Sequence, residues 1–342
     1  MKERNNPIPE DIVYPFSGIP TFLRSKLVTE LGDLEKLNPT IAVMGVPFDE
    51  GCPYMPGSRF GSRTIREHSL RFSRNGYYDY ELKKILLKEE LSRGRIVDIG
   101  DVNVIPTDVE GTFHRITQMV ETVMKKNRML ITLGGDHSIT YPIVRGISQP
   151  IHVIHFDAHS DFAPIYDGYQ YTNMHAFRHI SQMPHVKSLT QIGIRSIRDT
   201  SVLDSIAAGN RVVGMDEYRE IGPKNIAQVV PEGEPCYVTI DIDAFDSTLV
   251  PGCVSAEPGG FLYNELRDSL GAIAERNPIV GYEMVEVAPQ LDVGTGITSY
   301  LAAQTVIEFL GRICEQPWWK EKYKNNRETE AVTFQSSIEN KV

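Results

Sequence analysis

The sequence predicts an α/β fold built on a parallel β-sheet with helices on both faces. Three observations support this prediction: short apolar runs of strand length recur along the chain, segments with helical spacing of apolar residues lie between them, and polar clusters follow several of the runs. A closed eight-stranded barrel would produce the same alternation. Periodicity alone cannot separate the two architectures, although both place ligands at the carboxyl ends of their strands.

About eight segments have the length and apolar character of buried strands. They are residues 40–46, 95–99, 129–133, 151–161, 189–194, 211–215, 235–246 and 279–287, of which 151–161 and 235–246 are apolar only in their first halves. Apolar spacing predicts helices over residues 62–72, 111–126, 263–274 and 300–314, and a further helix beginning near Ser138. Loops rich in glycine and proline cover residues 51–61 and 250–260.

The composition indicates one large domain over residues 1–342, with an N-terminal arm at 1–35 and a polar C-terminal tail at 318–342. The net charge of -10 argues against nucleic acid or an anionic membrane as a partner, because both need a basic surface. No apolar run has the length of a signal-peptide core or a membrane span, so we expect a soluble cytoplasmic protein. The four cysteines are scattered, and we expect reduced thiols.

Residues 151–161 end in Asp157, His159 and Asp161, three side chains of metal-ligand type at alternate positions. Alternate side chains of an extended segment point the same way, so the three converge on one side of a strand end. Carboxylate together with imidazole suits Mn, Ni, Zn or Fe better than Ca or Mg. Taken alone, the stretch has a solvated polar loop as its alternative explanation.

Two other strand ends add ligands. His137 follows residues 129–133 after two glycines, which places it beside the carboxyl end of 151–157, and Asp241 and Asp243 follow a third apolar run. Four carboxylates and two imidazoles are more than one divalent ion needs, but they suit two ions that share a pair of carboxylates and a bridging water. Such a water ionises near neutral pH, so the sequence predicts hydrolysis of a small cationic substrate.

Four motifs, in this order, resemble the ureohydrolase superfamily of arginases, agmatinases and related guanidino hydrolases. They are Gly-Gly-Asp-His-Ser at 134–138, Asp-Ala-His-Ser-Asp at 157–161, Thr-Ile-Asp-Ile-Asp-Ala-Phe-Asp at 239–246 and Met-Val-Glu-Val-Ala-Pro at 284–289. The resemblance spans about residues 17–311. It implies a three-layer α/β/α, arginase-like fold with an eight-stranded parallel sheet, two Mn²⁺ per subunit with Ni²⁺ as the alternative, and a homo-oligomer, either a trimer or a hexamer.

The resemblance also implies a role for each site residue. Two residues match ligands of the first ion, two match ligands of the second and two match the bridging pair: His137 and Asp161, His159 and Asp243, and Asp157 and Asp241, respectively. Glu286 matches the carboxylate that holds the substrate guanidinium, which pairs with carboxylate through parallel hydrogen bonds. Asp161, Glu286 and His175 are the expected catalytic residues.

Within the superfamily, residues 17–24, 56–63 and 257–260 resemble the agmatinase branch, which implies hydrolysis of agmatine to urea and putrescine. Two segments depart from that branch. Residues 171–178 place Asn173 where agmatinases carry a proton-shuttling histidine, but Asn-Met-His at 173–175 is similar to the arginase version of this segment. We therefore predict that His175 protonates the leaving amine.

The second departure is the loop at 251–257, where Cys-Val-Ser replaces the Thr-Gly-Thr that is common in agmatinases. This loop is expected to face the substrate tail, so we predict that Asn173, Cys253 and Ser255 bind substrate together with Glu286. Free guanidine, guanidinobutyrate, a substituted guanidine or a biguanide is then the alternative substrate, with nickel as the alternative metal. A catalytically inactive binding protein and a mononuclear metal-dependent deacetylase are the alternatives outside this class.

Overall fold

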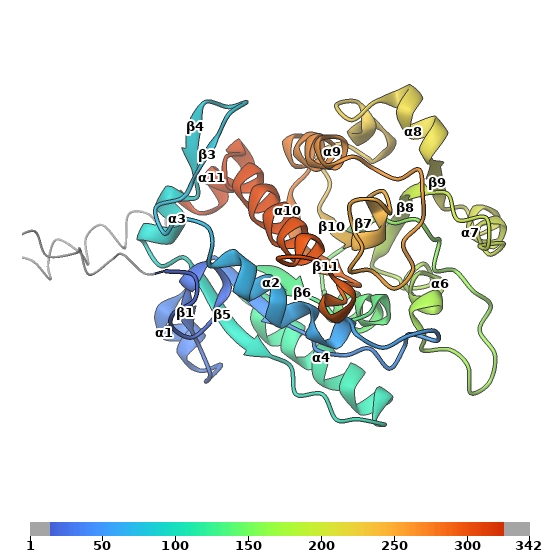
Figure 1. Cartoon of the computed structure of the whole chain (residues 1–342), viewed down its shortest axis with the longest axis horizontal. Coiled ribbons are helices and arrows are strands. Elements are labelled where there is room, and N and C mark those ends of the chain that lie inside the picture. The colour runs from blue at the N-terminus through green and yellow to red at the C-terminus, as the bar shows by residue number, and fades with distance from the viewer. Residues whose placement is uncertain (1–13, 325–342) are drawn as a thin grey trace, which may run out of the picture.

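The computed structural model describes residues 14–324 and contains one large parallel sheet covered by helices (Figure 1). Its strands run in the order β1-β5-β2-β6-β11-β10-β7-β8-β9, and each neighbouring pair is parallel. The strands are β1 (Lys26–Leu27), β2 (Ile41–Gly45), β5 (Ile96–Asp101), β6 (Met129–Leu133), β7 (Ile151–Phe156), β8 (Val186–Ile194), β9 (Arg211–Gly214), β10 (Cys236–Asp241) and β11 (Ile279–Val285). The sheet is open, with β1 and β9 at its edges, so the barrel alternative is excluded.

All eight predicted strands are present, and β1 is a ninth strand that the sequence did not indicate. It has two residues, which is too short for an apolar pattern, and it pairs with β5 through Lys26↔Val97 and Leu27↔Asp98. A separate antiparallel hairpin, β3 (Tyr77–Asp79) with β4 (Lys84–Leu86), was also not predicted.

Helices pack on both faces of the sheet and give the three layers that were predicted. One face carries α2 (Gly61–Ser69), α8 (Met215–Ile221), α9 (Tyr263–Arg276), α10 (Ile297–Cys314) and α11 (Pro317–Lys322), and Figure 1 shows α10 lying across this face. The other face carries α1 (Asp33–Leu37), α4 (Val109–Met124), α5 (Thr140–Arg145) and α6 (Ala176–Ile180). The short helices α3 (Lys88–Ser92) and α7 (Val202–Ala207) complete the set.

The two faces use alternate residues of the same strands. In β2, Ile41 and Val43 belong to the first core, whereas Ala42 and Met44 belong to the second. A strand covered on both faces needs apolar residues at every position, which explains the unbroken apolar runs in the sequence.

The strand order differs from the prediction at one point that matters for the site. We expected the end of β6, which leads to His137, to lie beside the end of β7, but β11 and β10 lie between them. Successive strands of an α/β sheet need not be neighbours, and the sequence does not contain the crossover pattern. As a result, the carboxyl ends of β6, β11, β10 and β7 form one continuous row at the centre of the sheet.

The ends of the described chain pack against this domain. In the N-terminal arm, Phe22 is fully buried and its backbone N–H donates to Asp98 of β5 at 2.8 Å. In the predicted C-terminal tail, Trp319 and Tyr323 are buried in the core on the α10 face. Residues 1–13 of the arm and 325–342 of the tail lie outside the described residues. Within residues 14–324, no helix combines the length and apolarity needed to cross a bilayer.

Candidate metal centre

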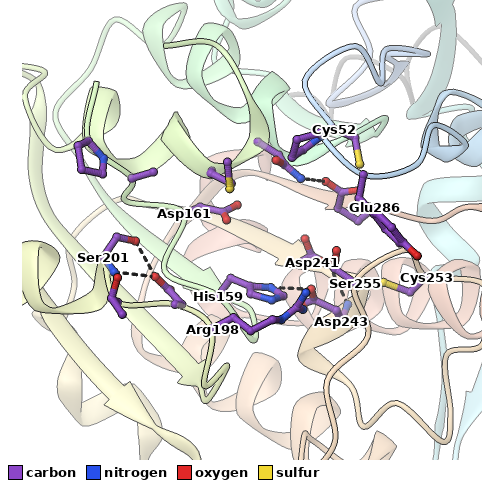
Figure 2. A pocket seen from close by; sticks show the side chains of 18 residues that line it. Cys52, His159, Asp161, Arg198, Ser201, Asp241, Asp243, Cys253, Ser255 and Glu286 are labelled. Atoms are coloured by element: carbon purple, nitrogen blue, oxygen red, sulfur yellow. Dashed lines mark hydrogen bonds and ion pairs between the residues drawn. The ribbon is translucent and has the colours of Figure 1, made fainter. Parts of the chain in front are cut away.

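The central row of strand ends brings the predicted ligands to one edge of the sheet, where four of them line a cavity of about 350 Å³. His137 follows β6, Asp157 follows β7, Asp241 ends β10 and Glu286 follows β11. The cavity lining includes His159, Asp161, Asp241, Asp243 and Glu286, and Figure 2 shows these side chains facing a common space. Parallel strands therefore gather groups from sequence positions about 150 residues apart at a single edge of the sheet.

The fully buried His137 is the centre of the first ligand group. Its Nδ1 lies 3.0 Å from Asp157 Oδ2, 3.1 Å from Asp241 Oδ2 and 3.3 Å from Asp161 Oδ2, yet it has no hydrogen-bond partner. Its Nε2 lies 2.8 Å from Thr239 Oγ1. We assign the ring proton to Nε2, so that Nδ1 turns a lone pair toward three carboxylates. A cation among these four atoms satisfies all of them.

His159 forms the second ligand group, on the cavity side of the first. Its Nδ1 lies 3.0 Å from Asp243 Oδ2 and 3.5 Å from Asp157 Oδ1. Asp157 thus presents one oxygen to each histidine, which is the geometry of a bridging carboxylate. The other ring nitrogen, Nε2, lies 3.5 Å from Glu257 Oε1. An acidic side chain next to this nitrogen helps to orient the imidazole ring of His159.

The electrostatics of the cluster favour bound cations. Burial raises the pKa of Asp241 well above its usual value, and the neighbouring charges of Asp243 and Asp157 raise it further. Burial and the charge of Asp157 raise the pKa of Asp161 to about 7. Carboxylates repel one another in a buried site unless positive charge separates them, and four carboxylates with two imidazoles suit a transition-metal pair. The residues therefore fit two divalent ions.

Glu286 lies beside the ligand groups and is held by hydrogen bonds on one oxygen. Its Oε1 accepts from the His137 backbone N–H at 2.9 Å and from Asn173 Nδ2 at 3.1 Å, and its Oε2 accepts no hydrogen bond from the described residues. Burial raises the pKa of this carboxyl group. Glu286 and Asp161 both have positive φ, 63° and 47°, a conformation that costs energy in non-glycine residues and is concentrated at functional sites.

The loop that follows β2 forms another wall of the cavity through Cys52 and Tyr54. Asp136 Oδ2 accepts the Gly51 N–H at 2.7 Å and ties this loop to the end of β6. A Cβ at Gly51 would lie 2.6 Å from Ser138 Oγ, so a side chain at this position would force the loop away. The close approach explains part of the glycine content of residues 51–61.

Three of the predicted substrate-binding residues, Asn173, Cys253 and Ser255, line the cavity as expected, but the structure does not bring His175 there. His175 is buried, its Nδ1 lies 2.7 Å from Thr172 Oγ1 and its Nε2 lies 3.2 Å from the Pro164 carbonyl oxygen. Both ring nitrogens thus have partners within the surrounding loop. This placement does not support the predicted role of His175 as proton donor to the leaving amine.

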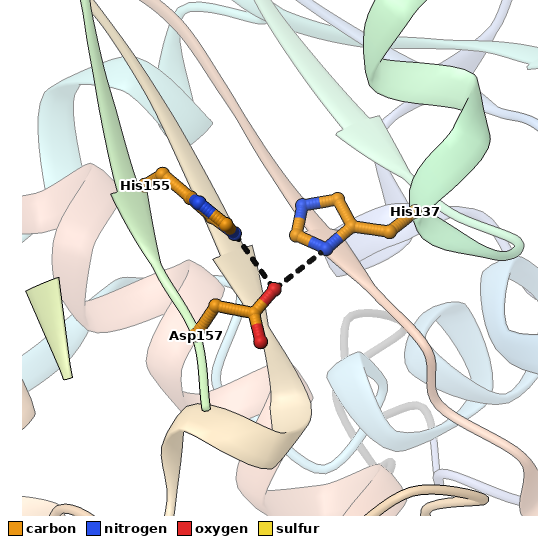
Figure 3. Close-up of side chains that lie close together, drawn as sticks. All are labelled: His137, His155 and Asp157. Carbon is orange, nitrogen blue, oxygen red and sulfur yellow. Dashed lines mark hydrogen bonds and ion pairs between the residues drawn. The ribbon is translucent and has the colours of Figure 1, made fainter. Parts of the chain in front are cut away.

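Sequence reasoning missed His155, which lies behind the first ligand group (Figure 3). Its Nε2 lies 2.7 Å from Asp157 Oδ2, and Gln191 Nε2 lies 2.9 Å from its Nδ1. Gln191 also donates from Nε2 to the Ser160 carbonyl and accepts at Oε1 from Ser205 Oγ, which fixes its amide orientation. His155 Nδ1 must then accept, and Nε2 donates to Asp157. The alternation of His155 with Asp157 and His159 along the sequence was the available signal.

Comparison with known proteins agrees with this geometry. The Arginase family model matches residues 39–311. This chain belongs to the Arginase family. It is 32% identical to proclavaminate amidinohydrolase of Streptomyces clavuligerus, over 86% of this chain and 93% of that protein, and 32% identical to guanidinopropionase of Pseudomonas aeruginosa, over 88% and 93%. It is 31% identical to an agmatinase of Bacillus anthracis, over 74% and 84%.

The solved structure of the proclavaminate amidinohydrolase has a TM-score of 0.78 with this chain, at 30% identity, and covers 88% of this chain and 99% of its own. The arginase-like fold predicted from the motifs is confirmed. Arginase-family enzymes are binuclear metal hydrolases of guanidino compounds, and the two histidine-centred groups are candidate ligand clusters for such a pair of ions.

Proposed function

We propose that this Arginase-family chain hydrolyses the terminal guanidino group of a small substrate and releases urea and an amine. The observation that supports the proposal is the position of Glu286 in the same cavity as both ligand groups. A carboxylate held by His137 and Asn173 on one oxygen offers its remaining lone pairs to a planar guanidinium. The guanidinium carbon then faces the carboxylate cluster.

Different residues of the site bind the substrate and assist the attack of water. When bound, two divalent ions activate water as a nucleophile at neutral pH and stabilise negative charge that develops in the transition state. Glu286 orients the guanidinium, and Asp161 lines the cavity beside His137, where it can accept a hydrogen bond from the attacking water. Manganese is the metal that the family resemblance implies, and the mixed carboxylate and imidazole donors also suit nickel.

Agmatine, with putrescine as the amine product, is the substrate that the sequence motifs favour. Relatives named agmatinase and guanidinopropionase are 31% and 32% identical to this chain. Sequence identity therefore does not distinguish between the two activities. Free guanidine, guanidinobutyrate and substituted guanidines remain in the same reaction class.

The test is urea release from a panel of guanidino compounds by protein reconstituted with manganese or with nickel, followed by the Glu286→Gln variant. Loss of the carboxylate charge should lower kcat/KM by about 100-fold or more, because a charge-assisted pair to the substrate is lost. The variant should still hold two metal ions per chain, since Glu286 is not among the predicted ligands. Absence of urea from every compound, in protein shown to hold two ions, would contradict the proposal.

A further inference from the structure

One side of the cavity carries a cation, Arg198. Arg198 and Ser201 line the cavity on the side away from Glu286 (Figure 2), and Thr200 between them in the sequence also lines it. Arg198 is the one lysine or arginine among the described residues that line this space. A substrate whose guanidinium binds Glu286 directs its other end away from that carboxylate, so the chemistry around Arg198 bears on the identity of the tail.

Arg198 is only partly neutralised by its protein partner. Its Nε and Nη2 donate to the same oxygen, Glu257 Oε1, at 3.1 and 2.5 Å, and its side chain is 67% exposed. Its Nη1 makes no hydrogen bond with the described residues. Glu257 itself is also occupied by Ser196 Oγ at 2.9 Å and does not line the cavity. The guanidinium therefore retains a free edge for a second carboxylate.

The lining offers no comparable partner for a cationic tail. Three of its carboxylates, Asp161, Asp241 and Asp243, lie in the ligand groups, and Glu286 faces the guanidinium of the substrate. The remaining carboxylate, Asp199, accepts hydrogen bonds on both oxygens from residues of its own neighbourhood.

Asp199 Oδ2 accepts the Ser160 N–H at 2.5 Å, and Oδ1 accepts the Ser201 N–H and Oγ–H at 3.0 and 2.6 Å. Both carboxylate oxygens of Asp199 are therefore occupied by hydrogen bonds from residues 160 and 201. An ammonium tail, as in agmatine, would thus meet the charge of Arg198 without an uncommitted carboxylate to offset it.

We infer that Arg198 binds a carboxylate at the far end of the substrate, so that the substrate class is an ω-guanidino carboxylic acid and not agmatine. The inference rests on the proposed function, because it requires that the guanidinium end occupies Glu286. A guanidino acid places one charge of each sign in the cavity, positive against Glu286 and negative against Arg198. Arg198 is then a specificity-determining residue whose effect depends on the tail and not on the bond that is broken.

The test compares substrates that share the guanidino group and differ in the tail: guanidinobutyrate and guanidinopropionate, agmatine, and uncharged butylguanidine. For the metal-loaded wild type we expect the highest kcat/KM with one of the two acids. In Arg198→Gln, the ratio of kcat/KM for that acid to kcat/KM for butylguanidine should fall by about 10- to 100-fold, the range for a lost charge-assisted hydrogen bond. In Arg198→Glu, agmatine should become the preferred substrate.

Arg63→Gln is the matched control, because Arg63 is an exposed arginine outside the cavity, paired with Glu67 on α2, and its loss should leave the ratio unchanged. A wild type that prefers agmatine or butylguanidine to both acids overturns the inference and leaves the proposed function intact. So does an Arg198→Gln variant in which all substrates slow by the same factor, since that result indicates an effect through Glu257 and His159. Failure of every substrate in protein that holds two ions overturns the proposed function itself.

Discussion

His155 Nε2 lies 2.7 Å from Asp157 Oδ2, the same oxygen that faces the lone pair of His137 Nδ1 at 3.0 Å. This hydrogen bond fixes the carboxylate of Asp157, whose two oxygens face His137 and His159. His155 is itself fixed by Gln191 and by stacking on Phe177, with ring centroids 3.7 Å apart. His155 thereby orients the candidate metal ligand Asp157.

We predict that His155→Asn weakens metal binding by about 10- to 100-fold, the usual cost of losing a group that orients a metal ligand. The direct measurement is competition of the variant with a chelator of known affinity, and excess metal should restore part of the activity. His152→Asn is the matched control on the same strand, since His152 bonds Ser188 and has no contact with the ligand groups. Equal metal affinities of His155→Asn and wild type would contradict this role.

Asp241→Ala should release metal and lower urea formation by about 1,000-fold or more, because it removes an oxygen that faces His137 and the partner of the Asp243 backbone N–H. Metal content measured by mass spectrometry and urea release report the two effects. Asp246→Asn is the control from the same motif. Asp246 accepts hydrogen bonds from Thr248, Gly259 and Gly260 in the following loop, so this variant should keep its ions. Turnover by metal-free Asp241→Ala would contradict the proposed chemistry.

The candidate ligands could be chosen from the sequence because most of them lie close together along the chain. Asp157, His159 and Asp161 lie two residues apart, as do Asp241 and Asp243, so each set follows one strand end closely, although Asp243 lies in a short 3-10 helix and Asp161 has a positive φ. The eight main strands were predictable for a similar reason, since burial on both faces leaves a continuous apolar run.

The features that were missed depend on tertiary arrangement. The position of β11 and β10 between β6 and β7 follows from crossover connections, which no local sequence pattern indicates. His175 was chosen from a motif, but the local loop engages both of its ring nitrogens. Arg198 belongs to no motif, and only the folded structure places it in a cavity with residues that follow other strands.

Arg66 of α2 makes a buried charge network that attaches this helix to β5. Its Nε and Nη2 donate to the two oxygens of Asp98 at 2.8 and 3.0 Å, and its Nη1 donates to Asp101 at 2.5 Å. Arg66→Ala leaves a buried carboxylate without its partner, so we expect the free energy of unfolding to fall by about 3–5 kcal/mol. Urea denaturation measures this change. Arg63→Ala on the exposed face of the same helix should change the free energy of unfolding by less than about 0.5 kcal/mol. Equal effects of the two variants would contradict a stabilising role for the buried charge network of Arg66.

Asp292 accepts hydrogen bonds from the first turn of α10, so its ionisation affects the stability of the protein at low pH. Burial raises the pKa of its carboxyl group, but the hydrogen bonds from Ser299 and Thr298 outweigh burial, and the net pKa is lowered. A carboxyl group whose pKa is lower in the folded state stabilises the fold at pH values above its unfolded pKa, and this stabilisation is lost as the pH falls through the folded pKa. Asp292→Ala should therefore destabilise the protein near neutral pH, by about 1 kcal/mol, the usual effect of losing a side chain that accepts N–H groups of a first helical turn.

The difference in unfolding free energy between wild type and Asp292→Ala should shrink as the pH falls from about 5 toward 3, because protonation removes the charge that accepts these bonds. Denaturant unfolding across this range measures it. Asp216→Ala on α8 is the control, since that carboxylate is fully exposed with only a 3.8 Å contact to Arg219. A difference for Asp292→Ala that stays constant down to pH 3 would show that the lost side chain acts through packing, and that its charge does not stabilise the first turn of α10.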